Sequence, residues 1–255
     1  MIIVRTYSEI DKQDWRLLAE TSPLSTWFQT DEAYRFYQSV SDMCAFVYGV
    51  MEEDKLVGVI VGYTTQEKCK LKQYFTARAI VVGGPLLDEN ISESALTMLL
   101  QTVYKQQGEA IYIEMRNLHD YSRWKTVFIT NGFAYQPHLN IQVACNDQHS
   151  MSEQRQRQVK KAIKNGAEIC EASSEQEIRD WYQILCQLYR QKVRTPLWSE
   201  AFFLQFYRNG VGKFLLVKYE GKVIGGMMCP IFSSKAITDG YCSLYSSSNP
   251  QTYHS

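Results

Sequence analysis

The sequence predicts a mixed α/β fold built from two tandem copies of one unit. Apolar strands alternate with amphipathic helices along the chain, which is typical of α/β proteins. Two short segments also recur at a nearly constant spacing, as expected of an internal repeat. DEAY from Asp31 and SEAF from Ser199 each begin the helix before a predicted hairpin. KLVG from Lys55 and KVIG from Lys222 each begin that hairpin's second strand, and the two spacings agree to within one position. Chance is the alternative explanation, because a helix followed by a hairpin is common in such folds.

The two halves also differ in charge, although the whole chain has a formal net charge of zero. Residues 1–150 carry 13 Lys and Arg against 18 Asp and Glu, a net charge of −5, whereas residues 151–255 carry 14 against 9, a net charge of +5. An anionic ligand is therefore expected to favour the second half or the junction between the halves.

No apolar run at the N-terminus resembles a secretion signal, and no other stretch approaches the roughly 20 apolar residues of a membrane span. We therefore expect a cytoplasmic protein without a transmembrane segment. The seven cysteines lie far apart with no C-x-x-C pair, so they predict reduced thiols and neither a zinc site nor a disulfide framework.

The first unit is expected to span residues 1–150. Its predicted elements are a strand at 2–7, helices at 11–19 and from 31, a hairpin at 44–65 turning at 52–55, a strand ending in Gly83-Gly84-Pro85, a helix at 92–107, a buried strand at 110–116, a helix at 121–130 and a strand at 135–145.

The second unit is expected to span residues 151–255. It begins with a basic helix and continues with helices at 174–193 and 199–210 and a hairpin at 213–232 that turns at Glu220-Gly221. Much less sequence follows this hairpin than follows the hairpin of the first unit. The second copy is therefore expected to be truncated at Ser255, or to have its exposed sheet edge covered by something else.

The order of three motifs carries a family resemblance. A strand runs into Gly83-Gly84-Pro85, a helix ends at Asn131-Gly132-Phe133, and a basic helix ends at Gly166. This order resembles the FemAB/FemX peptidoglycan-bridge aminoacyltransferases, which have two tandem N-acetyltransferase-like (GNAT) units. The family pattern at this junction is roughly T-R-x-x-I-R-K-A-x-K-x-G-V, and it is matched by Arg157, Val159, Lys160, Lys161, Ala162, Lys164, Gly166 and Ala167. The resemblance covers most of the chain.

The resemblance implies an aminoacyl- or acyltransferase acting on an amine of a cell-envelope precursor. The donor would be an aminoacyl-tRNA, the acceptor a nucleotide- or lipid-linked muropeptide, and the protein could contact a membrane-bound substrate peripherally. Both substrates are anionic, and no tightly bound cofactor is implied. One alternative is an N-acyltransferase that uses acyl-CoA to modify a polysaccharide or small amine. Another is a non-catalytic, truncated remnant that only binds.

The composition of the chain and the residues of one loop argue against two kinds of ligand, double-helical DNA and coenzyme A. A protein that reads double-helical DNA is disfavoured, because the pI is about 6.9 and no DNA-binding motif is recognisable. GNAT enzymes that use acetyl-CoA hold its pyrophosphate on backbone N–H groups after the central strand, in an R/Q-x-x-G-x-G/A loop. Gly83-Gly84-Pro85 occupies that place here, and Pro85 lacks an N–H donor. Coenzyme A is therefore not expected at this loop.

The clearest candidate binding residues lie on the basic helix. Arg157, Lys160, Lys161 and Lys164 fall at i, i+3, i+4 and i+7 on one stripe, opposite Val159, Ala162 and Ile163. One face could pack while the other binds the pyrophosphate of the acceptor or the tRNA backbone. Gly166 suits the left-handed position after the helix. A solvated helix face is the alternative.

The remaining candidates are single residues. Arg78 lies on the strand that leads to Gly83, and Arg116 ends the next predicted strand. Both could hold a phosphate or a carboxylate, as could Arg194 in the second unit. Ion-paired or edge residues are the alternative. Tyr241 could line a pocket or simply pack against a neighbouring strand. The four histidines are scattered, so the sequence identifies neither a catalytic base nor a metal-ligand set.

Overall fold

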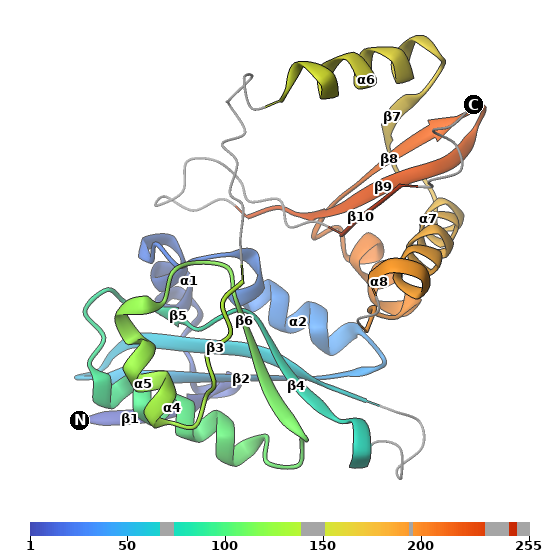
Figure 1. Ribbon diagram of the computed structural model, residues 1–255. Coiled ribbons are helices and arrows are strands. Elements are labelled where there is room, and N and C mark those ends of the chain that lie inside the picture. The colour runs from blue at the N-terminus through green and yellow to red at the C-terminus, as the bar shows by residue number, and fades with distance from the viewer. Residues whose placement is uncertain (67–73, 139–150, 194–195, 233–244, 249–255) are drawn as a thin grey trace. The chain divides into compact units, whose positions relative to one another are not determined.

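The computed structural model describes residues 1–66, 74–138, 151–193, 196–232 and 245–248, and in these ranges the chain has the mixed α/β fold that the sequence predicts (Figure 1). The described residues up to 138 belong to one compact unit, and those from 151 onward belong to a second. Each unit is described by itself below.

The first unit is built on a mixed sheet with the strand order β1-β2-β3-β4-β6, in which β5 also pairs with β3. The pairs are antiparallel except for β4 and β6, which run parallel. The strands are β1 Ile2–Thr6, β2 Met43–Glu52, β3 Lys55–Thr65, β4 Arg78–Gly83, β5 Leu86–Leu87 and β6 Tyr112–Asn117.

Helices cover both faces of this sheet (Figure 1). On one face lie α1 (Lys12–Thr21) and α2 (Asp31–Ser39), and on the other lie α4 (Glu93–Gln106) and α5 (Lys125–Thr130). Short helices η1 (Tyr7–Glu9), η2 (Trp27–Gln29) and η3 (Ser122–Trp124) join them. The helices α1, α2 and α4 begin where the sequence predicts. Their N-cap residues are Asp11, Thr30 and Ser92, whose side chains accept hydrogen bonds from backbone N–H groups of the first turn. Leucines of α4 pack with apolar residues of the sheet in the main core.

The second unit contains the sheet β10-β9-β8-β7, with antiparallel pairing throughout. Its strands are β7 Glu168–Glu171, β8 Gly212–Tyr219, β9 Lys222–Pro230 and β10 Tyr245–Ser248, and its helices are α6 Glu153–Lys164, α7 Glu175–Leu188 with the π-turn η4 Tyr189–Val193, and α8 Glu200–Asn209. Fully buried aromatic side chains from α7, α8 and β8, among them Trp181, Phe203 and Phe214, form its core.

The internal repeat is visible in backbone details. In the hairpin β2-β3 the register shifts after Val50, and in β8-β9 it shifts after Val217, at the same sequence offset that separates Lys55 from Lys222. Both hairpins then turn through two residues with positive φ, Glu53-Asp54 (50° and 64°) and Glu220-Gly221 (49° and 74°). Chance similarity of a helix and a hairpin would not place the same bulge and the same turn at one offset. The preceding helices differ slightly, because Asp31 is the first residue of α2 whereas Ser199 is the N-cap of α8.

Some predictions need correction. The strand expected at 110–116 is β6, but none of its residues is buried, because among the described strands it pairs only with β4. Residues 135–138 form no regular structure, and the rest of the strand expected there lies outside the described residues. Strand β7 was not predicted. The expectation of reduced thiols is wrong for Cys229, which is disulfide-bonded.

Candidate functional site

The carboxyl ends of the parallel strands β4 and β6 are where an α/β sheet usually binds its ligand, and here the end of β4 is held by a buried polar network. The side-chain amide of Gln29 donates to the carbonyl oxygens of Gly83 and Gly84, each at 3.1 Å. The hydroxyl of Tyr121 lies 3.0 Å from the oxygen of Gly83 and donates to that of Pro85 at 2.8 Å. Gly83 and Gly84 have φ of +89° and +79°, which glycine adopts without strain. The turn is therefore fixed by contacts within the unit.

This arrangement leaves little for a phosphate to bind. Strands β4 and β6 remain paired as far as Gly83 opposite Asn117, so their carboxyl ends do not separate. Helix α4 begins after Ser92, whose backbone N–H lies 3.4 Å from a carboxylate oxygen of Glu52, and Glu93 is in its first turn. An anion at this helix end would face two carboxylates, which oppose the attraction of the helix dipole.

A charged strip crosses β4 and β6 on the opposite side from α4. Ala79 of β4 packs in the core beneath α4, so strand alternation places Arg78 on the other face, together with Glu114 and Arg116 of β6. The guanidinium of Arg116 holds the carboxylate of Glu114 with two hydrogen bonds of 2.8 and 3.2 Å. Hydrogen bonding to Arg116 lowers the pKa of Glu114, and the positive charges of Arg116, Arg78 and His138 act in the same direction. The strip is a half-exposed group of fixed charges that could bind a carboxylate beside an amine.

His119 lies in the loop after β6, two positions before Tyr121 of the network at Gly83. It makes a hydrogen bond with the backbone of Ser25, and burial lowers its pKa, so the imidazole is neutral at pH 7. Its position next to the carboxyl end of β6 was not singled out from the sequence.

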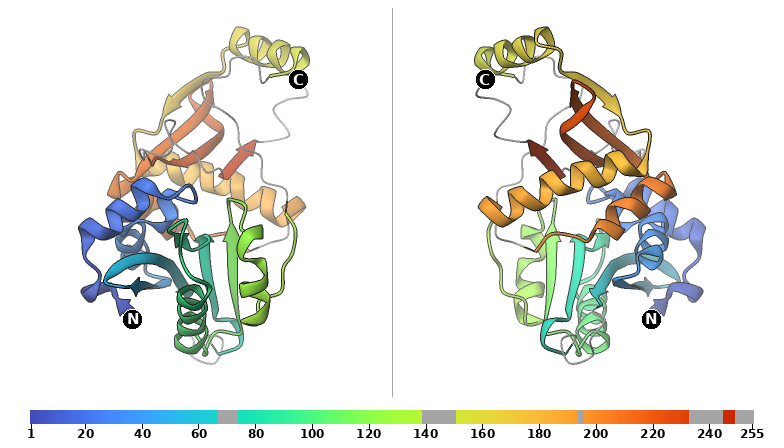
Figure 2. Two further views of the ribbon diagram at one scale, coloured as in Figure 1. Left: turned by 90° about the vertical axis from the view of Figure 1, so that its left-hand side faces the viewer. Right: turned by 90° about the vertical axis from the view of Figure 1, so that its right-hand side faces the viewer.

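The basic helix α6 is formed as predicted but does not pack as predicted. None of its residues is buried, and Val159 and Ile163 are 38% and 59% exposed. Figures 1 and 2 show α6 projecting from the sheet of its own unit. Gly166 has a φ of +93° and closes the helix as expected. The predicted apolar face therefore lacks a partner among the residues described.

The four cations of the predicted stripe lie on one side of α6, and all four are exposed. Arg157 pairs with Glu153 at 3.1 Å on the surface, whereas no ion pair of Lys160, Lys161 or Lys164 occurs within the described part of the chain. Three ammonium groups thus remain to meet an anion. Arg78 and Arg116 share the strip with Glu114, while Arg194 and Tyr241 lie outside the described residues.

Sequence reasoning missed Glu114 and the network around Gly83. The signal for Glu114 was available, because residues two apart on a strand share a face and Arg116 was already a candidate. The network joins Gln29 to Gly83 and Tyr121, which are so distant along the chain that no local pattern reveals the contact. No described group of three or more His, Cys, Asp or Glu side chains could hold a metal ion, and no described helix is long and apolar enough to cross a membrane.

Comparison with known proteins defines the fold. A crystal structure of FemX superimposes with a TM-score of 0.54 and 13% sequence identity, covering 86% of this chain and 57% of the FemX chain. The chain thus has the fold of FemX, with GNAT-like units, and spans less than two thirds of the length of FemX. The resemblance predicted from the motif order is confirmed at the level of fold.

Single-unit acetyltransferases match less closely. Glucosamine-6-phosphate N-acetyltransferase from Arabidopsis thaliana has a TM-score of 0.36 and 10% identity, covering 56% of this chain and 98% of its own. An aminoglycoside 6′-N-acetyltransferase from Acinetobacter haemolyticus has a TM-score of 0.38 and 13% identity, covering 57% of this chain and 99% of its own. No family model and no curated protein sequence matches the chain.

Proposed function

We propose that the protein is a transferase of the GNAT type that moves an aminoacyl or acyl group to an amine of an anionic cell-envelope precursor. The observation that carries the proposal is the FemX fold over 86% of the chain, with the helix-hairpin repeat present in both units. Fold alone does not define chemistry, so the donor and acceptor are argued from the residues.

An aminoacyl-tRNA is the favoured donor. The turn at Gly83 in the first unit has its carbonyl oxygens bonded by Gln29 and Tyr121, and the N-terminus of α4 faces Glu52 and Glu93. These features argue against holding the pyrophosphate of coenzyme A there. Helix α6 instead offers exposed lysines on one face, which suits the phosphate backbone of an RNA.

The acceptor is expected to combine an amine with an acidic group. Arg78 and Arg116 supply positive charge for a carboxylate or phosphate, and Glu114 between them could receive an ammonium group. Because Glu114 is held ionised by Arg116, it serves to orient the amine and is a weak base. The described residues support binding and orientation, which are major contributions to acyl transfer.

The transfer itself balances without a further reactant. The neutral amine nitrogen attacks the ester carbonyl carbon of the donor, a C–N bond forms, and the C–O bond to the ribose breaks. The proton lost from nitrogen leaves with the ribose hydroxyl. This reaction requires an intracellular donor, so we place it in the cytoplasm, with peripheral contact to a membrane where the acceptor is lipid-linked.

Equilibrium binding separates the donor hypotheses. The protein is titrated with a fluorescent aminoacyl-tRNA analogue whose ester is replaced by a stable amide, and in parallel with coenzyme A and an acyl-CoA. Saturable tRNA binding that excess coenzyme A does not displace supports the proposal. Saturable coenzyme A binding without tRNA binding would replace it with the acyl-CoA-dependent enzyme, and binding of neither donor would favour a protein that only binds the acceptor.

A further inference from the structure

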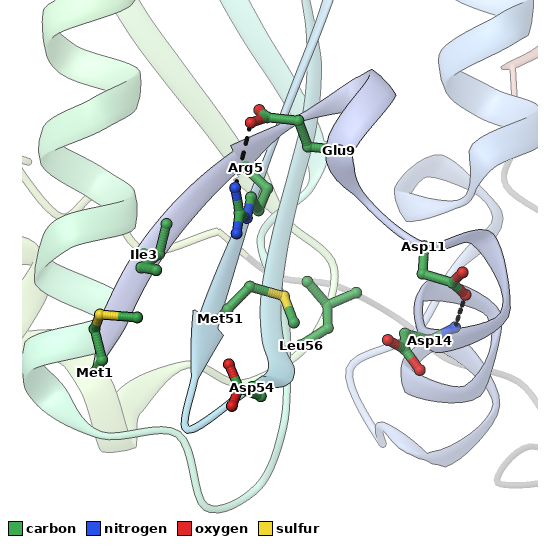
Figure 3. A pocket seen from close by; sticks show the side chains of 9 residues that line it. All are labelled: Met1, Ile3, Arg5, Glu9, Asp11, Asp14, Met51, Asp54 and Leu56. Carbon is green, nitrogen blue, oxygen red and sulfur yellow. Dashed lines mark hydrogen bonds and ion pairs between the residues drawn. The ribbon is translucent and has the colours of Figure 1, made fainter.

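A hollow beside the first strand of the first unit has an apolar floor and an acidic rim (Figure 3). Its volume is about 170 Å³, and Ile3, Met51 and Leu56 form its floor. The carboxylates come from three elements: Glu9 from η1, Asp11 and Asp14 from the start of α1, and Asp54 from the hairpin turn.

The positive charge of this hollow does not balance its carboxylates. Arg5 is the one basic side chain in the lining, and it pairs with Glu9 at 3.4 Å. The nearby lysines are engaged elsewhere, Lys12 with Asp31 and Lys55 with Asp88. Within the described residues no ion pair involves Asp11, Asp14 or Asp54. The carboxylate of Asp11 accepts hydrogen bonds from the backbone N–H groups of Gln13 and Asp14. The rim therefore suits a cation from outside the unit.

The second copy of the repeat provides an internal comparison. It has a hollow of about 330 Å³ at the equivalent place, lined by Lys218 and Gly221, which occupy the repeat positions of Met51 and Asp54. In this copy Lys218 forms an ion pair with Glu177. In the second unit the ammonium group of Lys218 thus neutralises a carboxylate at this site. In the first unit Met51 occupies that position, so the acidic rim has no such ammonium group.

One surface of the second unit has complementary chemistry. Arg155, Val159 and Ile163 follow one another at i, i+4 and i+8 along α6, so they form a stripe distinct from the lysine face. All three side chains are exposed, and no ion pair of Arg155 is present in the part of the chain that the structure describes. The stripe presents two apolar side chains and one cation, which match the apolar floor and acidic rim of the hollow.

We infer that the protein self-associates by seating the Arg155-Val159-Ile163 stripe of one copy in the acidic hollow of a second copy. Val159 and Ile163 cover the apolar floor, and the guanidinium of Arg155 meets the carboxylates of Asp14 and Asp54. The lysine face of α6 points away from this contact, so the inference stands independently of the proposed transferase function. A contact between two different surfaces lets each copy both give and receive a helix.

Sedimentation equilibrium of the nuclease-treated protein tests this association. The native chain is expected to form dimers or larger species that weaken with added salt. Arg155→Glu and Asp14→Lys should each raise the dissociation constant by about tenfold or more, because each places like charges together. An equimolar mixture of the two variants should regain association, since each reversed side chain then meets an opposite charge.

Two further variants keep the test decisive. Ile163→Asp alters an exposed side chain of the stripe without changing the rim, and it should also weaken association. Lys105→Glu reverses an exposed charge at the end of α4 and should leave association unchanged. Circular dichroism confirms that each variant is folded. A native protein that remains monomeric at every accessible concentration, or an oligomer insensitive to all three substitutions in the stripe and rim, overturns the inference.

Discussion

Neutralising the lysine face of α6 should weaken tRNA binding by an amount that the structure sets. Of the four predicted cations, Arg157 is already paired with Glu153, which leaves Lys160, Lys161 and Lys164. Replacing these three by Gln removes about three phosphate contacts, and each contributes roughly 0.7 to 0.9 to the slope of log K against log salt. The slope should therefore become shallower by about 2 to 3. The same relation predicts a loss of roughly 100-fold in affinity near 0.1 M salt.

Fluorescence anisotropy with labelled tRNA, repeated over a range of salt concentrations, measures both quantities. Because no residue of α6 is buried, the triple variant should keep its thermal stability within the error of the measurement. A matched variant with Lys105→Gln and Lys222→Gln changes exposed lysines elsewhere and should bind as the native protein does. An unchanged slope in the triple variant would contradict the binding role and identify the face as a solvated surface.

Three further predictions concern the network at the end of β4. Gly84→Ala should cost about 2–4 kcal/mol in urea unfolding, because a side chain there would meet Asn117 and Tyr121 at 2.5 and 2.8 Å and adopt a strained φ. Gly132→Ala, with a similar φ but open space, should cost only the strain of roughly 1–2 kcal/mol; equal costs would contradict the packing argument. Tyr121→Phe should destabilise by about 1–3 kcal/mol, since the carbonyl oxygen of Pro85 loses its buried donor, and a change below the error of the unfolding midpoint would refute this. Burial lowers the pKa of His119, so the unfolded state binds the proton more readily and stability falls as the pH drops from about 6.5 toward the folded pKa. His119→Asn should flatten this dependence, and an unaltered pH profile of stability would exclude the cause.

The repeat was predictable because its signals are local. The signals that mark the elements are apolar alternation, a charged interruption at the turn, and the N-cap residues Asp11 and Ser92. Each of these signals can be recognised within a few residues of sequence. The shared bulge after Val50 and Val217 was not predicted, because it depends on cross-strand pairing.

Burial was predicted less well than secondary structure. An apolar run such as that of β6 occurs in both central and edge strands of a sheet. The exposure of β6 could therefore not be deduced from the sequence. The amphipathic pattern of α6 predicted a packed face, yet Val159 and Ile163 are exposed. A pattern indicates which face can pack, but it does not supply the surface that covers it.

The candidate site was partly predictable. Arg78 and Arg116 were named because one lies on the strand before Gly83 and the other ends the next strand, and the structure brings both near Glu114. The network of Gln29 and Tyr121 depends on contacts between distant segments, so only the fold reveals it.

The proposed transfer of an aminoacyl group to an amine can be tested directly. The protein is incubated with a pool of isotopically labelled aminoacyl-tRNAs and a muropeptide precursor that carries a free amine, and the acceptor is analysed by mass spectrometry. If the protein catalyses the transfer, an acceptor species heavier by one aminoacyl residue should accumulate only when the protein is present, with matching loss of charged tRNA. Saturable binding of tRNA or acceptor without any such product would contradict catalysis and assign the protein a binding role.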